Sequence, residues 1–273
     1  MKVIRGRTAL VTGAASGIGR AIALALAGQG AALHLLDSDE TNLAQTANQA
    51  NELGVTATLR CCDLTQPDQV SSAVSEIMAV GKPIHILINN AGLAYYGPTH
   101  EMSVTQWHDV MTVNLLSPIQ LVCELLPLLA AQDEAHIVNV CSLFGLATLR
   151  KAAAYQASKH GLVGFTAALR AEYCRPEFGV TAICPGFVPT AMLERFATGQ
   201  VEQKRHKIPG WVTMTPEYVA ARTLRAIRRN EGLVVIPAAA RLLWWLTRLS
   251  PELMDMLTRE AWRRRPKLHI APR

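Results

Sequence analysis

Short apolar runs alternate with longer helical patterns from the first residue to about residue 240, and this order constrains the fold most strongly. Strands joined through helices form parallel sheets, because each connection carries the chain back to the edge from which it started. The sequence therefore predicts an α/β fold, a doubly wound parallel sheet of about seven strands with helices on both faces. The expected strands are Thr8–Thr12, Ala31–Asp37, Val55–Asp63, Ile84–Asn89, Ala135–Ser142, Val180–Pro185 and Leu233–Pro237.

Cap and stop residues predict where the intervening helices begin and end. Two capping boxes, Thr65–Asp68 and Ser103–Gln106, each mark a helix start, and Pro216 fits a first helical position. Gly54 fits a C-terminal stop. The expected helices are Arg20–Gln29, Glu40–Leu53, 65–80, 103–131, Tyr155–Cys174 and Pro216–Arg229.

The composition fits one large globular domain, because half of the 273 residues are apolar and only 18% are charged. Neither a repeat nor a low-complexity linker interrupts the chain. We expect one domain over 1–240, with 241–273 as a helical, basic extension of it. Six cysteines lack zinc-site spacing, so we predict reduced thiols and no metal site. Neither a signal peptide nor an uncharged apolar run of about 18 residues is present, which predicts a cytoplasmic protein.

The net charge of +6 is concentrated at the C-terminal end. Residues 241–273 hold eight Lys or Arg and three Asp or Glu, a local balance of +5. A nucleic-acid-binding motif does not accompany these charges, so we expect no nucleic-acid partner. Residues 241–265 also carry tryptophans and leucines in helical patterns. Three interpretations remain open: peripheral contact with an anionic membrane, a subunit interface, or a cover on a substrate pocket.

A glycine-rich turn follows the first expected strand and precedes the first helix. Such a turn lets the backbone approach a pyrophosphate at a helix N-terminus. Its candidate cofactor-binding residues are Gly13, Ser16, Gly17, Ile18 and Gly19. Asp37 ends the second expected strand, where a carboxylate accepts both ribose hydroxyls and repels a 2′-phosphate. The pattern favours NAD over NADP.

Tyr155 and Lys159 are four residues apart, so a helix places them on one side, one turn apart. An ammonium group close to a phenol favours the phenolate and lowers the tyrosine pKa toward neutrality. Ser142 supplies a hydroxyl at the end of the fifth expected strand. The three side chains predict an acid/base site.

In this order the motifs resemble the short-chain dehydrogenase/reductase family over about residues 5–240. The matching segments are Thr12–Gly19 (TGxxxGxG), Asn89–Gly92 (NNAG), Asn114, Ser142, Tyr155–Lys159 (YxxxK) and Pro185–Gly186. The resemblance implies a Rossmann-like fold, hydride transfer between a nicotinamide cofactor and a CH–OH group, and a homodimer or homotetramer.

The resemblance also implies a role for each matching residue. Tyr155 would exchange a proton with the substrate oxygen, and Ser142 would hold that oxygen. Lys159 would lower the Tyr155 pKa and bind the nicotinamide ribose. Asn114 would distort its helix and hold a proton-relay water. The remaining cofactor contacts would come from Asp63, Leu64, Asn90, Ala91, Val188 and Thr190.

Apolar residues dominate the expected substrate side. They lie in Phe187–Met214, where the family usually places a segment over the substrate, and at Leu93, Tyr95, Tyr96, Phe144, Leu146 and Leu149. An apolar pocket predicts a lipophilic alcohol or ketone of a steroid-like, retinoid-like or aromatic kind. The alternatives are an NADPH-dependent reductase of acyl-chain carbonyls and a non-catalytic NAD-binding regulator.

Overall fold

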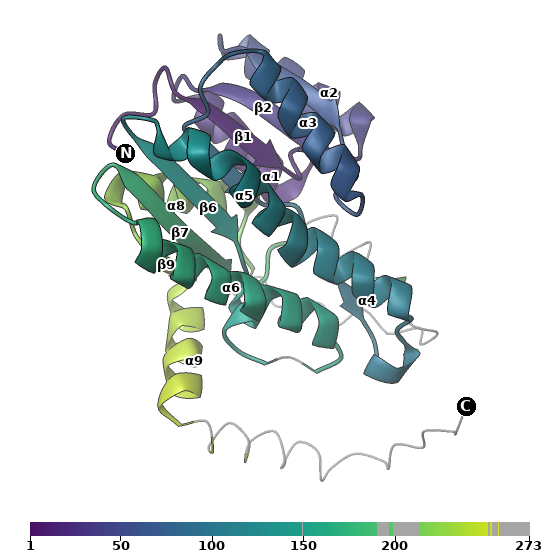
Figure 1. The fold of residues 1–273 in the computed structure, drawn as a ribbon. Coiled ribbons are helices and arrows are strands. Elements are labelled where there is room, and N and C mark those ends of the chain that lie inside the picture. The colour runs from purple at the N-terminus through teal and green to yellow at the C-terminus, as the bar shows by residue number, and fades with distance from the viewer. Residues whose placement is uncertain (149, 190–196, 199–212, 251, 253–255, 257–273) are drawn as a thin grey trace.

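Seven parallel strands form one sheet in a computed structural model that describes residues 1–148, 150–189, 197–198, 213–250, 252 and 256 (Figure 1). The strands are β1 (Thr8–Thr12), β2 (Ala32–Asp37), β3 (Ala57–Cys61), β4 (Ile86–Asn89), β6 (Ala135–Val140), β7 (Phe178–Pro185) and β9 (Leu233–Ile236). Their spatial order is β3-β2-β1-β4-β6-β7-β9. The predicted single-domain, doubly wound α/β fold is confirmed.

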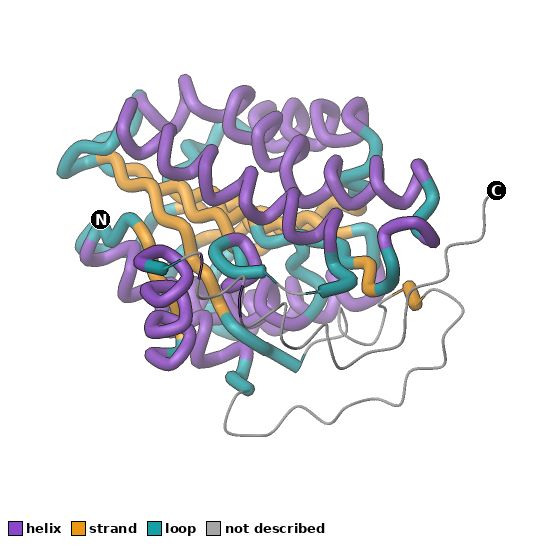
Figure 2. Tube along the Cα trace, turned by 90° about the horizontal axis from the view of Figure 1, so that it is seen from below, coloured by secondary structure: helices purple, strands orange, loops and turns teal. Residues whose placement is uncertain are grey.

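Helices cover both faces of this sheet, which lies between two helical layers (Figure 2). One apolar cluster joins the sheet to α1 (Gly17–Ala27), α2 (Glu40–Glu52) and α8 (Pro216–Arg229). A second joins the opposite face to α3 (Pro67–Ala79), α5 (Ser117–Ala130) and α6 (Ala153–Tyr173). Every residue of β1, β6 and β7 is buried, as expected for strands covered on both sides.

The strand order reverses between β1 and β4, which are direct neighbours with Val11 opposite Ile88. From β1 the chain runs outward through β2 and β3, then crosses to β4 and continues the other way. At such a reversal, the loops after the two strands diverge and leave a crevice at their carboxyl ends. The candidate site residues gather at this edge.

The two predicted capping boxes have different outcomes. The Ser103 hydroxyl oxygen accepts from the Gln106 backbone N–H, and the Gln106 side-chain oxygen accepts from the Ser103 backbone N–H. α4 (Val104–Met111) therefore begins as predicted. The box at Thr65 is wrong, because Gln66 is the N-cap of α3 and makes no side-chain capping bond. The fixed φ of Pro67 suits the first helical position. The N-cap of α3 therefore lies at Gln66, one residue after the expected Thr65. The Thr65 hydroxyl instead donates to Asp63.

The single helix expected over 103–131 is divided. A π-helix, Thr112–Leu116, separates α4 from α5. By length and composition alone, Val104–Ala130 is apolar enough to cross a membrane, and 44% of its most apolar window is buried inside the protein. Leu121, Val122, Leu125 and Leu129 of α5 belong to the core cluster shared with α3 and α6, so this stretch packs as a core helix.

A small second sheet and a C-terminal helix also belong to the described part of the chain. A short parallel pair, β5 (Tyr95–Tyr96) with β8 (Ala197–Thr198), was not predicted. After β9, α9 (Ala238–Leu249) begins three residues before the expected extension. Most of the helical pattern expected over 251–265 lies outside the described residues.

Candidate active site

The carboxyl ends of the parallel strands bring the predicted site residues to one edge of the sheet. They follow or end different strands: the glycine turn after β1, Asp37 in β2, Asp63 after β3, Asn90 after β4, Ser142 after β6 and Val188 after β7. Thr190, Leu149 and residues 190–196 and 199–212 of the expected substrate cover lie outside the described residues.

The glycine turn is fastened to the loop after β4. The Thr12 hydroxyl oxygen accepts from the backbone N–H groups of Asn90, at 3.0 Å, and Ala91, at 3.1 Å. The Asn90 side-chain amide donates to the carbonyl oxygens of Thr12 and Gly13. Gly13 has a φ of +65°, and a Cβ at Gly19 would lie 2.0 Å from the Gly13 carbonyl oxygen. The turn therefore requires both glycines.

The residues after β1 and β2 fit a dinucleotide. Ser16 caps α1 without a side-chain capping bond, and the first turn of α1 contains no acidic residue. The first turn of this helix therefore supplies no carboxylate of its own to compete for the N-terminal N–H groups, which suits a pyrophosphate. Asp37 stands beside the turn, where its carboxylate accepts from the backbone N–H of Ala15 at 2.9 Å and of Asp39 at 3.0 Å. A carboxylate at this position can accept hydrogen bonds from ribose hydroxyls.

Two other expected cofactor residues follow β3. The Asp63 carboxylate accepts from the backbone N–H and the hydroxyl of Thr65, both at 2.9 Å. Leu64 is buried, and its carbonyl oxygen accepts from the Ser117 hydroxyl at 2.6 Å. These bonds fix the loop that borders the expected adenine position. The adenine contacts themselves remain predictions, as do the ribose contacts of Asn90 and Ala91.

Asn114 is fully buried at the centre of the π-helix. Its oxygen accepts from the Leu93 backbone N–H at 2.7 Å, and its amide donates to the Leu93 carbonyl and to the Ser158 hydroxyl. The Ser158 hydroxyl in turn donates to the Tyr155 carbonyl at 2.8 Å. The side chain of Asn114 thus connects the loop after β4 to the helix that carries Tyr155.

The Ser142 hydroxyl lies close enough to the Tyr155 phenol to lower the pKa of that phenol. Ser142 caps a short 3-10 helix, Leu143–Gly145, and accepts from the Phe144 backbone N–H at 3.1 Å. A Cβ at Gly145 would lie 2.6 Å from the Lys159 carbonyl oxygen, so only glycine lets this turn approach α6 so closely. The approach brings the serine hydroxyl to the tyrosine.

The pKa values of this pair differ from the sequence expectation. Burial raises the pKa of Tyr155, and the nearby Ser142 hydroxyl only partly offsets it. Burial likewise lowers the pKa of Lys159. The expectation that Lys159 brings the Tyr155 pKa down is therefore not met. The loss of solvation outweighs the effect of an ammonium group 5.9 Å from the ring centroid.

Three residues of this site were missed from the sequence: Thr12, Gly145 and Ser158. Thr12 lies within the glycine motif and Ser158 within the Tyr155–Lys159 segment, so both were visible as motif letters. Their functions depend on contacts across 78 and 44 sequence positions, which a local pattern does not show. Gly145 offered a signal only as a glycine three residues after Ser142.

An aromatic pair borders the substrate side. The rings of Phe144 and Phe187 meet edge to face, with centroids 5.4 Å apart. Phe144 follows Ser142 by two residues, and Phe187 follows the end of β7 by two. Both rings are half-buried, and the backbone N–H of Phe144 donates to the Ser142 hydroxyl oxygen.

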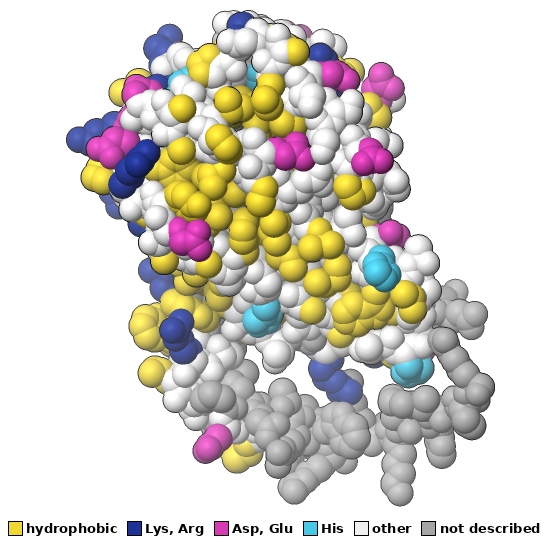
Figure 3. Space-filling view, viewed as in Figure 1, with side chains coloured by type: hydrophobic (Ala, Val, Ile, Leu, Met, Phe, Trp, Pro, Cys, Tyr) yellow, Lys and Arg dark blue, Asp and Glu magenta, His cyan; other side chains and the backbone are white. Residues whose placement is uncertain are grey.

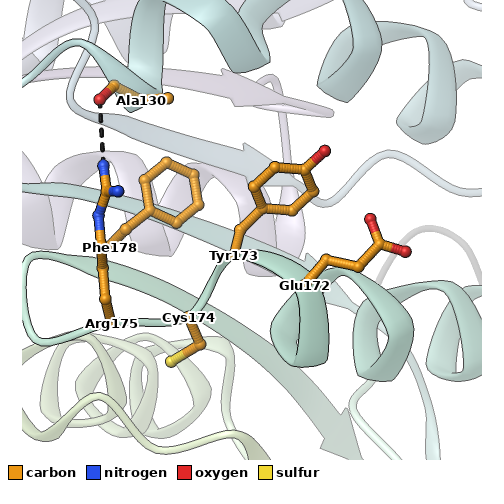
Figure 4. Close-up of a pocket in the computed structure, with 6 residues that line it drawn as sticks. All are labelled: Ala130, Glu172, Tyr173, Cys174, Arg175 and Phe178. Carbon is orange, nitrogen blue, oxygen red and sulfur yellow. Dashed lines mark hydrogen bonds between the residues drawn. The ribbon is translucent and has the colours of Figure 1, made fainter.

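A shallow hollow lies at the opposite edge of the sheet, between the ends of α5 and α6 and the start of β7 (Figure 4). Arg175 crosses it and donates to the Ala130 carbonyl oxygen at 3.3 Å. The hollow is remote from Ser142, because β7 begins there and ends at the site. It is therefore no part of the candidate active site.

The chain is similar to known proteins over most of its length. The short chain dehydrogenase family profile matches residues 7–200. Ketoacyl reductase HetN of a Nostoc species is 30% identical over 266 residues, which cover 95% of this chain and 90% of the relative. A short-chain dehydrogenase/reductase from Burkholderia phymatum, solved with NAD, shares 27% identity and a TM-score of 0.82 over the full length of both chains. A metagenomic short-chain oxidoreductase, solved with NADP, has a TM-score of 0.71 at 27% identity, covering 85% of this chain and 96% of its own.

Proposed function

Because this chain belongs to the short-chain dehydrogenase/reductase family, we propose that it is an NAD(H)-dependent enzyme that interconverts a secondary alcohol and a ketone. The observation that carries the proposal is the proximity of the Ser142 hydroxyl to the Tyr155 phenol, with Lys159 held one turn away by its bond to the Val140 carbonyl, at the edge of the sheet where the glycine turn lies. A hydroxyl that binds the reacting oxygen and a phenol that exchanges its proton suffice for the acid/base half of the reaction.

Each residue of the candidate site has a distinct role in the proposed reaction. When bound, NAD(H) accepts or supplies the hydride, as nicotinamide cofactors do. Ser142 holds the substrate oxygen, and the Tyr155 phenol oxygen takes its proton during oxidation or returns one during reduction. Lys159 adds positive charge beside Tyr155, and its ammonium is oriented by a 2.9 Å bond to the Val140 carbonyl. Asn114 positions this helix through Ser158.

The cofactor preference rests on Asp37. A carboxylate beside the glycine turn would repel a 2′-phosphate, and neither Ala14, Ala15 nor Ser38 provides a compensating cation. A second candidate is an NADPH-dependent reductase of acyl-chain carbonyls. The name of the HetN relative and the NADP in one similar structure support it.

The proposal extends to the substrate and the setting. The Phe144–Phe187 pair supports a lipophilic substrate of a steroid-like, retinoid-like or aromatic kind. The proposed enzyme is a cytoplasmic homodimer or homotetramer with its catalytic domain in 1–240.

The test is a comparison of NAD(H) with NADP(H) across hydroxysteroids, retinol, aromatic alcohols, polyols and acyl-chain ketones. We expect NAD-linked turnover on a lipophilic alcohol and at least about ten-fold lower kcat/KM with NADP. NADPH-linked reduction of acyl ketones alone would establish the second candidate instead. The absence of NAD-linked turnover on every lipophilic compound would contradict the substrate proposal.

A further inference from the structure

The outer face of α9 is apolar and exposed. Leu242, Trp245, Leu246 and Leu249 follow helical spacing, so they form one stripe. Their exposed fractions are 63%, 48%, 44% and 75%. An exposed stripe that includes a tryptophan and three leucines is unusual for a helix that only closes a domain.

Basic residues border this stripe. Arg241 and Arg248 are seven positions apart, which places both on the same flank of the helix, and both are exposed. α9 contains neither Asp nor Glu. Apolar and basic side chains accordingly lie together on the part of the molecule that projects at the lower left of Figure 3. A helix of this composition matches the interface of an anionic bilayer.

The inner face fixes the helix against the catalytic domain. Ala240 is buried and Trp244 packs against the cluster that contains Leu143 and Ala147, the residues that follow Ser142. The Arg248 guanidinium lies 5.9 Å from the Trp244 ring centroid, which favours its position on the flank. Since α9 directly follows β9, it extends from the edge of the sheet at which the site lies (Figure 1).

We propose that the outer face of α9 binds the surface of a bilayer that contains anionic phospholipids. The stripe of Leu242, Trp245, Leu246 and Leu249 enters the interfacial region, and Arg241 and Arg248 contact lipid phosphates. Binding in this orientation turns the edge of the sheet that carries Ser142 toward the membrane. The lipid contact involves none of the catalytic residues, so it stands independently of the proposed reaction.

The positive charge of α9 favours a bilayer over a second copy of the chain as its binding partner. Two copies related by a two-fold axis would bring Arg241 and Arg248 of each near the same groups of the other, with no acidic residue in α9 to pair with them. Lipid phosphates neutralise these side chains. A second copy is therefore the outcome that the experiment must be able to detect.

The experiment is co-sedimentation of the full-length protein with vesicles of phosphatidylcholine, with and without about 30% phosphatidylglycerol. The test variant combines Leu246→Gln with Leu249→Gln. Its matched control combines Leu53→Gln with Val80→Gln, two exposed apolar residues at the ends of α2 and α3. A charge variant, Arg241→Gln, is matched with Arg225→Gln, an exposed arginine of α8.

We expect binding to anionic vesicles that weakens with salt, and at least about ten-fold weaker binding for the leucine variant. Arg241→Gln should weaken binding about five-fold, the factor given by about 1 kcal/mol per basic residue. Both controls should bind like the unchanged protein. Three results would overturn the proposal: no binding to anionic vesicles, equal losses in the controls, or a leucine variant that only lowers the oligomer mass in light scattering.

Discussion

The Lys159 ammonium donates a 2.9 Å hydrogen bond to the carbonyl oxygen of Val140, the last residue of β6. Ser142 lies two residues beyond that carbonyl, and Tyr155 lies one turn before Lys159 on α6. One bond thus connects the helix that carries the phenol to the strand that leads into Ser142. The relative position of the acid/base groups depends on the backbone as much as on the side chains.

Replacement of Tyr155 by Phe tests the proton transfer directly. The variant keeps the ring but lacks the hydroxyl, so we expect turnover to fall at least about 1000-fold while the Kd for NAD changes by no more than about three-fold. Steady-state rates and a fluorescence titration with NADH measure the two effects. Tyr173→Phe, at the other end of α6, is the control and should leave both unchanged. Lost NADH binding with turnover retained would contradict the assignment.

The direction of the Tyr155 pKa predicts a second result. Burial holds this pKa above its ordinary value in the protein alone, so the phenol is protonated at neutral pH. A bound cation beside the ring stabilises the phenolate, so saturation with NAD should lower the pKa. Alcohol oxidation, which uses the phenolate, should then increase about ten-fold per pH unit below that pKa.

An ultraviolet titration of phenolate absorbance, with and without NAD, measures this change. The difference between the unchanged protein and Tyr155→Phe isolates the signal of Tyr155 from those of the other tyrosines. Lys159→Met should reduce the decrease caused by NAD. A Tyr155 pKa that is already near neutrality without NAD would contradict the dominance of burial.

The arrangement of the site was predictable because a parallel sheet brings strand ends together. Once the apolar runs are assigned to strands, Asp37, Asn90 and Ser142 must all lie near one edge. Local signals were equally reliable where no competing residue was present. α8 spans Pro216–Arg229 as predicted, since Thr215 caps it and Pro216 fits its first position.

Predictions from local sequence failed where a neighbouring residue, burial from solvent or a distant segment determined the structure or the pKa. Pro67 displaced the cap expected at Thr65. The sign of the Tyr155 pKa shift depends on how completely α6 is covered, which sequence spacing does not give. The β5–β8 pair joins residues about 100 positions apart, and two-residue strands leave no periodic pattern.

Asp37→Asn tests the cofactor preference with little change in shape. The amide oxygen still accepts one of the two backbone bonds from Ala15 and Asp39, but the negative charge is lost. We expect the KM for NAD to rise about ten-fold or more, and kcat/KM for NADP to rise relative to NAD. Asp39→Asn, which keeps an N-cap for α2, is the control. An unchanged NAD-to-NADP ratio for Asp37→Asn would remove the basis for NAD.

Two glycine substitutions should change stability in opposite directions. A Cβ at Gly19 would lie 2.0 Å from the Gly13 carbonyl and 2.4 Å from the Asn90 amide nitrogen, so Gly19→Ala must displace the turn. We expect a loss of about 1–3 kcal/mol in unfolding free energy and weaker NADH binding. Gly164 lies inside α6 with nothing within 4 Å of its Cβ position. Gly164→Ala should gain about 0.5–1 kcal/mol and keep NADH binding. Urea unfolding and NADH titration measure both, and equal effects would contradict the packing argument.

The burial of His136 should make the fold less stable in mild acid. Its Nε2 donates to the Thr181 hydroxyl, which in turn donates to the Glu231 carbonyl, and its buried Nδ1 has no partner in the described structure. A proton on Nδ1 would therefore be buried without an acceptor. Burial, with smaller effects of the N-terminal ammonium and Arg170, lowers the pKa of His136 to about 3.

The unfolded chain thus binds a proton near pH 6.5 that the folded protein binds only near 3. His136 therefore stabilises the fold fully above pH 6.5, and this contribution falls by about 1.4 kcal/mol per pH unit as the pH drops toward 3. His136→Gln should flatten this dependence between about pH 7.5 and about pH 5.5 in urea unfolding, whatever its effect on stability at neutral pH. His108→Gln, at an exposed position of α4, should retain the full slope. Equal slopes in both variants would show that His136 is not the titrating group.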